Sequence, residues 1–243
     1  ASREERAVAQ LGASRAESVG FDLDGALAEL ARLRGVLGEH SAREAALKQR
    51  TALAKTKDAR RTLLLERARV LEQQLSRPGA AAECVNEVVQ LFPEDAGLVD
   101  ELARLREAAG DSSGVVAAVA IAIELAGSGG KKDTPDARDR LRALHRRRGE
   151  LCSGLAYDAG KGLASFQFLL AQDSDDLTAR EAFEALLSRE GRAKELAEHL
   201  SREVERRKKL PSSDKNNSAS VLAGLERRRA ELLRGPLADA AAA

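Results

Sequence analysis

The chain of 243 residues contains an internal repeat with a period of about 80 residues. Residues 144–151, Leu-His-Arg-Arg-Arg-Gly-Glu-Leu, recur 81 positions later at 225–232 as Leu-Glu-Arg-Arg-Arg-Ala-Glu-Leu. Residues 64–71 form a weaker copy 80 positions upstream, which retains both leucines and Arg67. One such unit cannot bury its apolar face alone, so neighbouring copies must stack, and the sequence predicts a continuous array.

The shift of 81 also holds between these anchors. It aligns 93–95 with 174–176, Leu102 with Phe183, Leu105 with Leu186, Gly110 with Gly191 and Val119 with Leu200. A third copy of the middle segment is expected upstream, where Leu27, Leu30 and Gly35 repeat the pattern of Leu102, Leu105 and Gly110. Several apolar positions and a terminal glycine kept in step argue against a chance alignment.

The composition favours helices. Ala, Leu, Arg and Glu dominate, whereas aromatic residues make up 2% of the chain. The dominant residues are good helix formers, and residues that strands prefer are scarce. The sequence therefore predicts an all-α fold. A hydrophobic fraction of 43% with a net charge of +1 argues against a disordered chain.

Each unit is predicted to contain four helices. In the best copy they span 136–157, 163–172, 177–189 and 193–208. Gly160 and Gly162 are expected to break the chain after the first helix, and an acidic turn at 173–176 follows the second. Gly191 suits the left-handed residue that ends the third helix.

Four parts are expected along the chain. They are partial helical repeats at 1–63, a unit with two hairpins at 64–135, its second copy at 136–218, and the start of a truncated copy at 219–243. Polar segments at 127–135 and 210–218 recur at the same phase and are predicted loops inside one continuous solenoid. Incomplete terminal copies and the absence of methionine suggest a piece of a longer protein.

A spacing of 12 residues, from a small residue in a second helix to a turn, resembles the tetratricopeptide repeat. Ala81 stands 12 positions before Pro93, with Val85 and Val88 between them, and Gly162 stands 12 before Ser174, with Phe166 and Leu169 between them. The resemblance implies a right-handed α-solenoid of antiparallel hairpins with about 11–12 helices. It also implies an inner groove that binds a peptide or a partner helix.

The cysteines and histidines suggest no metal site. Cys84 and Cys152 lie 68 positions apart within apolar helical patterns, which predicts buried free thiols. His145 lies beside Arg146 in a basic helix and is expected to be solvated. His199 is expected on an exposed helix face. The histidines are not grouped with cysteines or carboxylates at metal-ligand spacing.

No catalytic residue, cofactor site or metal site is predicted, and the chain is expected not to be an enzyme. Motifs of nucleotide-binding, hydrolase and metalloprotease sites are missing from the sequence. The Gly- and Lys-rich run at 127–132 lacks the spacing of a phosphate loop. The longest apolar run, 115–123, is too short to cross a bilayer, which takes about 20 residues. The compartment stays open.

Arginine clusters are the candidate partner-binding residues. The repeated pair of clusters comprises Arg146, Arg147, Arg148, Arg227, Arg228 and Arg229. Interleaved acidic residues favour a solvated helix face with i,i+4 ion pairs, although the repeat also allows a basic ridge. The predicted function is a scaffold for a protein or peptide partner. The alternative is a helical binder of nucleic acid or another anionic surface, and end-to-end self-association is a further expectation.

Overall fold

The computed structural model describes residues 22–128, 134–209 and 219–235, and these residues form helices joined by short turns, with no strand among them. Six α-helices come first: α2 (Leu23–Val36), α3 (His40–Leu53), α4 (Lys57–Arg69), α5 (Pro78–Leu91), α6 (Ala96–Ala108) and α7 (Ser112–Ser128). Five follow: α8 (Pro135–Ser153), α9 (Ala159–Gln172), α10 (Leu177–Arg189), α11 (Ala193–Lys208) and α12 (Ala219–Arg234). A short π-helix, η1 (Val70–Gln74), continues α4. The predicted all-α fold is confirmed.

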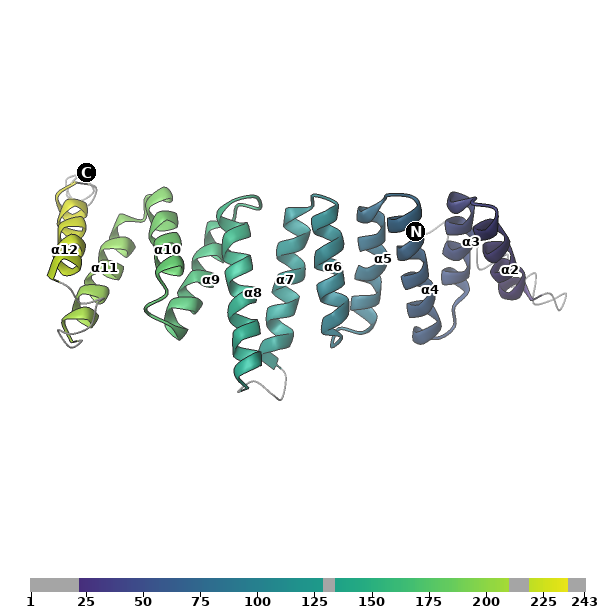
Figure 1. The fold of residues 1–243 in the computed structure, drawn as a ribbon, viewed down its shortest axis with the longest axis horizontal. Helices are drawn as coiled ribbons and strands as arrows, with labels where there is room; N and C mark the ends of the chain where they lie inside the picture. Colours follow the sequence, from purple (N-terminus) through teal and green to yellow (C-terminus); the bar gives the residue numbers. More distant parts are fainter. Residues whose placement is uncertain (1–21, 129–133, 210–218, 236–243) are drawn as a thin grey trace. The chain divides into compact units, whose positions relative to one another are not determined.

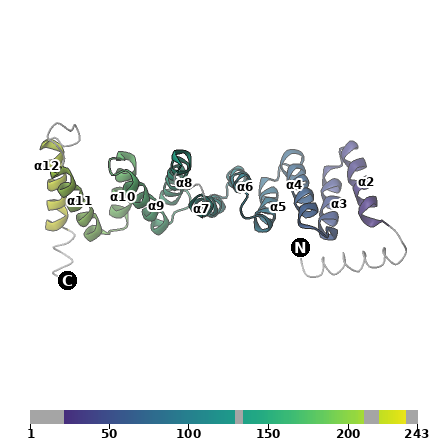
Figure 2. The same cartoon turned by 90° about the horizontal axis from the view of Figure 1, so that it is seen from below.

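The helices fall into two compact units, residues 1–144 and 145–243, and the boundary lies inside α8. In the first unit, α2 to α7 lie side by side in chain order, and each runs antiparallel to the next (Figures 1 and 2). In the second unit, α9 packs on α10, and α11 packs on α12. Both units are therefore arrays of helical hairpins, as expected for tetratricopeptide-like repeats.

Glycines in the left-handed conformation end corresponding helices. Gly38, Gly110 and Gly191 have φ angles of 72°, 71° and 66°, and they follow α2, α6 and α10. Only glycine adopts this conformation without strain, which explains its recurrence. The alignment of Gly35 with Gly110 was wrong, because Gly35 lies inside α2 and Gly38 supplies the stop. The register of the upstream copy therefore moves by three residues.

Aspartates begin corresponding helices. The Asp95 carboxylate accepts hydrogen bonds from the backbone N–H groups of Gly97 (3.1 Å) and Leu98 (3.3 Å) at the start of α6. Asp176, 81 positions later, accepts one from the N–H of Ala179 (3.0 Å) at the start of α10. Each cap satisfies helix donors that would otherwise lack a partner. The repeated turn before these helices is thus confirmed.

Two predicted breaks are wrong. Gly160 and Gly162 lie inside α9, because Asp158 caps this helix through the N–H of Lys161 (3.0 Å) and starts it at Ala159. The preceding helix, α8, ends at Ser153 rather than at 157. The loop expected at 127–135 is shorter, since α7 continues to Ser128 and α8 begins at Pro135; its centre and the loop at 210–218 lie outside the described residues.

Close packing between α8 and α9 depends on Gly149. A Cβ atom at this position would lie 2.7 Å from the Phe166 ring, closer than van der Waals contact permits. In the first unit, the aligned positions hold Ala68 and Val85, which are both buried. A larger residue on one helix thus accompanies a smaller residue on its partner in each copy, as dense core packing requires.

We predict that Gly149→Ala destabilises the protein by about 1–3 kcal/mol, because the added methyl group overpacks the contact with Phe166. The double variant Gly149→Ala/Phe166→Val carries the residue pair of the first unit and should recover most of this loss. Urea unfolding followed by circular dichroism measures both free energies.

Gly224→Ala provides the matched control. Gly224 lies within α12, and no atom outside its own helical surroundings lies within 4 Å of a Cβ at this position. Alanine there should stabilise the helix by roughly 0.5–1 kcal/mol. Equal effects of the two single variants would contradict the proposed clash.

Candidate interaction groove

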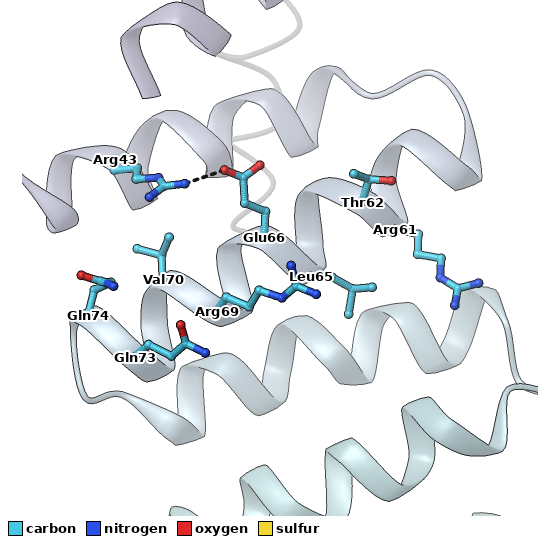
Figure 3. A pocket seen from close by; sticks show the side chains of 9 residues that line it. All are labelled: Arg43, Arg61, Thr62, Leu65, Glu66, Arg69, Val70, Gln73 and Gln74. Carbon is cyan, nitrogen blue, oxygen red and sulfur yellow. Dashed lines mark hydrogen bonds and ion pairs between the residues drawn. The ribbon is translucent and has the colours of Figure 1, made fainter. Parts of the chain in front are cut away.

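A groove of about 560 Å³ lies along α4 and η1, with α3 contributing one wall. Figure 3 shows the side chains that line it, with Arg61 and Gln74 at opposite ends. The lining residues are Arg43, Arg61, Thr62, Leu65, Glu66, Arg69, Val70, Gln73 and Gln74. Most of them come from one helix, which therefore determines the chemistry of the groove.

The π-helix η1 lies at one end of the groove. The backbone N–H of Leu75 donates to the carbonyl of Val70 (3.1 Å), which closes the wider turn. Ser76 then adopts a φ of 52°, and α5 begins two residues later. Such wide turns shift the side chains that follow them relative to an α-helix, and they occur often at binding sites. Gln73 and Gln74 are presented from this turn.

Two of the three arginines in the groove are held by acidic neighbours. Arg43 pairs with Glu66 at 2.9 Å across α3 and α4. Arg61 pairs with Asp95 at 2.8 Å, and its guanidinium lies 4.9 Å from the centre of the Phe92 ring. These contacts fix the orientation of both side chains, so the walls of the groove are ordered before any ligand binds.

Arg69, near the middle of the groove, is exposed and lies close enough to Glu101 of α6 to interact with it electrostatically. Gln73 and Gln74 are also exposed, whereas Val70 is buried and Leu65 partly buried beneath them. The groove therefore offers an exposed guanidinium and two amides above the apolar side chains of Leu65 and Val70. A carboxylate accepts paired hydrogen bonds from a guanidinium, so an acidic segment with small apolar side chains suits this surface.

The predicted arginines of α8 contact neighbouring helices. Arg146 pairs with Asp176 at 2.6 Å, and Arg148 Nε donates to Ser165 Oγ at 2.7 Å. Ser165 is fully buried in α9, and Arg147 is half-buried between the other two arginines. Arg146 and Arg148 therefore hold α8 against the rest of the second unit.

The predicted arginines of α12 differ from one another. Arg227 forms an i,i+4 ion pair with Glu231 at 3.0 Å, as the pattern predicts. Arg228 reaches the buried carboxylate of Glu184 on α10 at 2.6 Å. Arg229 is exposed. Arg146, Arg148, Arg227 and Arg228 thus contact other side chains of the chain, and the joint role of the six arginines as a basic ridge stays a prediction.

Both histidine predictions were wrong. His145 is only 7% exposed and stacks on Phe168, with ring centres 3.8 Å apart and an interplanar angle of 12°. His199 is largely buried beside Phe183 and Glu184. His145 aligns with buried Leu64 in the first unit, so its position in the repeat outweighs the polarity of its neighbours. Cys84 and Cys152 are buried free thiols, as predicted.

The sequence held one signal for the groove. Arg61, Leu65, Arg69 and Gln73 recur at a spacing of four, which places them on one face of a helix. A mixed stripe of this kind is also typical of any solvated helix face. The π-helix and the pairing of Arg43 with Glu66 have no signature in the sequence.

Comparisons with known proteins give similarity at the level of solved structures. No protein-family model and no curated protein sequence matches the chain. The crystal structure of MamA protein is similar with 15% identity and a TM-score of 0.34, over 77% of this chain and 93% of that chain. A putative kinesin light chain from Podosopora anserina with nearly identical TPR-like repeats is similar with 16% identity and a TM-score of 0.39, over 76% of this chain and 96% of that chain.

No helix among the residues that the structure describes is both long and apolar enough to span a bilayer. Within the same ranges, histidine, cysteine, aspartate and glutamate do not gather in groups of three or more that could hold a metal ion.

Buried His145 should make stability depend on pH. Burial, together with the positive charge of Arg148, lowers the pKa of His145 to about 4. The neutral ring is therefore favoured in the folded state, and its stabilising effect is present above pH ~6.5 and lost as the pH falls towards 4. We predict that this group alone costs about 2 kcal/mol of folding free energy between pH ~7.5 and pH ~5.

His145→Leu tests this prediction, because leucine occupies the aligned position 64. Urea unfolding of the parent and the variant at both pH values measures the difference in their pH dependence, in which contributions from all other groups cancel. The variant should lose less stability on acidification by the stated amount. Parallel pH profiles for the two proteins would show that His145 does not titrate with folding.

Proposed function

We propose that this chain is a non-enzymatic interaction module that binds an acidic peptide or partner helix in the groove along α4. The observation that carries the proposal is the exposed guanidinium of Arg69 between Arg43 and Arg61, which are held by acidic partners, above the apolar Leu65 and Val70. Apolar contacts supply affinity, and the guanidinium selects a carboxylate and fixes the register of the ligand.

The shape of the groove supports a chain-like ligand rather than a small substrate. It runs from Arg61 in α4 to Gln74 in η1 (Figure 3), and it is open to solvent rather than enclosed. Catalysis generally needs a site that excludes water and holds reacting groups in fixed positions. An extended peptide or a helix gains contacts along the whole length of such a surface.

The repeated arginine clusters support a second candidate, a binder of nucleic acid or another anionic surface. Arg229 is exposed on α12, outside the groove. Phosphate binding releases counterions, so its affinity falls steeply with salt. A carboxylate groove with an apolar floor should lose less affinity under the same change.

We predict that Arg69→Glu weakens binding of a labelled helical peptide of Leu, Ala and Glu by about 2 kcal/mol, roughly thirtyfold in Kd. The variant removes a charge-assisted hydrogen bond and places a carboxylate against the ligand. Fluorescence anisotropy at low and high salt measures the affinity of the purified chain for this peptide. A peptide with Lys in place of Glu and a single-stranded DNA serve as competitors.

Arg229→Glu is the matched control, since it reverses the charge of an exposed arginine outside the groove. It should leave peptide affinity unchanged. If Arg229→Glu weakens binding and Arg69→Glu does not, the ligand occupies the basic ridge instead. If DNA is the only competitor that displaces the labelled peptide, and does so only at low salt, the second candidate replaces the groove proposal.

We also propose that copies of the chain associate by stacking end to end. Leu30, Leu33 and Val36 on α2 and Leu37 directly after it are exposed, which supports an apolar contact at this helix. Sedimentation of the chain over a range of concentrations, with Leu33→Glu as the comparison, tests whether this face joins two copies.

A further inference from the structure

Four charged side chains are buried in the second unit, where a core would ordinarily be apolar. Arg180 and Glu184 on α10 are 6% and 5% exposed, and Glu203 and Arg207 on α11 are 6% and 3% exposed. Ionised groups lose hydration when they are buried, so they persist only when partners surround them. The contacts of these four residues define an ionic joint between α10, α11 and α12.

Glu203 is the centre of the ionic joint. Its carboxylate accepts hydrogen bonds from Nε of Arg206 at 2.9 Å and from Nε of Arg207 at 2.5 Å. The Arg180 guanidinium on the facing helix lies 3.2 Å from the same carboxylate. Arg206 also pairs with Asp175 at 2.8 Å in the turn before α10. One carboxylate thus links three arginines from both helices of the hairpin.

Glu184 is the second centre and connects the hairpin to α12. Arg228 of α12 lies 2.6 Å from its carboxylate, although the arginine itself is half exposed. Nε2 of His199 on α11 lies 3.5 Å from Glu184 Oε1, and both atoms are buried without a hydrogen-bond partner in the described chain. The position of α12 therefore depends on a buried charge as well as on the packing of Leu225.

The equivalent hairpin of the first unit has an apolar interior. The shift of 81 aligns Arg180 with Val99, Glu184 with Ala103, His199 with Ala118, Glu203 with Ala122 and Arg207 with Ala126. The first four apolar counterparts are buried. Helix boundaries agree as well, since α6 and α10 both begin and end at positions that differ by 81. Charges thus replace core residues within an unchanged hairpin register.

These two interiors respond differently to opening. When an apolar hairpin opens, it exposes hydrocarbon to water, and the whole of the newly exposed apolar surface costs free energy. A buried ion pair that opens regains hydration, and this gain offsets much of the lost attraction. We infer that the ionic joint opens as a local unit that frees α12, whereas the apolar hairpin α6/α7 stays closed under the same conditions.

The opening does not require protonation. Burial alone would raise the pKa of Glu203, but the hydrogen bonds from Arg206 and Arg207 and the charge of Arg180 outweigh it and hold the pKa at about 2. Burial alone would also raise the pKa of Glu184, but the nearby His199 and Arg228 outweigh this effect, and the pKa of Glu184 is lowered. Both groups are therefore ionised at neutral pH, and local opening there separates charges that are already formed.

Native-state hydrogen exchange of the full chain, read out by mass spectrometry of peptides, tests the inference. The amides of α10, α11 and α12 should exchange through a common opening at least tenfold more often than those of α5 to α7. Glu203→Gln leaves three arginines without their shared carboxylate and should raise that opening by roughly a hundredfold. Glu205→Gln, the same change at an exposed site of α11, should have no effect.

A variant with the opposite expected sign keeps the test decisive. Arg180→Met/Glu203→Leu/Arg207→Met replaces the buried ions by apolar side chains of similar volume. If the ionic joint is the reason for local opening, this variant should slow exchange of α10 to α12 by roughly tenfold or more. Faster exchange in this triple variant, or exchange of parent α10 to α12 only through global unfolding, would overturn the inference even if Glu203→Gln does not fold.

Discussion

The stacking of each helix against its neighbours in chain order is the constraint on which the structure depends. A hairpin of two short helices has an apolar stripe on more than one side, and a free hairpin cannot cover it. In the first unit, α5 packs between α4 and α6, and its Val85 and Val88 are fully buried. The groove follows from the positions that this stacking gives to α3 and α4.

Much of the fold could be predicted because its determinants are local or periodic. The spacing of apolar residues reveals α10 and α11 with their correct bounds, and Asp176 and Gly191 mark the ends of α10 through short-range chemistry. Errors arose where a local signal depended on a contact distant in the sequence. Gly162 was interpreted as a break, yet it lies inside a capped helix where Leu186 approaches closely. His145 was expected in solvent because its sequence neighbours are basic, yet its stacking on Phe168 decides its burial.

The groove was less accessible to prediction for a related reason. The stripe of Arg61, Leu65, Arg69 and Gln73 is visible in the sequence, but its meaning depends on which arginines find acidic partners. Asp95 is 34 positions from Arg61, and Glu66 pairs with an arginine of a different helix. Arg146 and Arg228 belong to the clusters that recur in the sequence, yet both pair with carboxylates of the chain that lie 30 and 44 positions away.

The interior of the second unit differs from that of the first at several aligned core positions. A repeat array tolerates a change at a core position if neighbouring positions change with it, because each hairpin contacts only its neighbours. Gly149 with Phe166 and Ala68 with Val85 are two solutions for one volume, and Arg180 with Glu203 replaces Val99 with Ala122. The exchange between Gly149 with Phe166 and Ala68 with Val85 conserves core packing. The exchange of Val99 and Ala122 for Arg180 and Glu203 replaces apolar contacts by an ion pair. The free energy of apolar contacts is lost on exposure to water, whereas hydration largely compensates the ion pair. Two hairpins with one backbone register therefore differ in their resistance to opening.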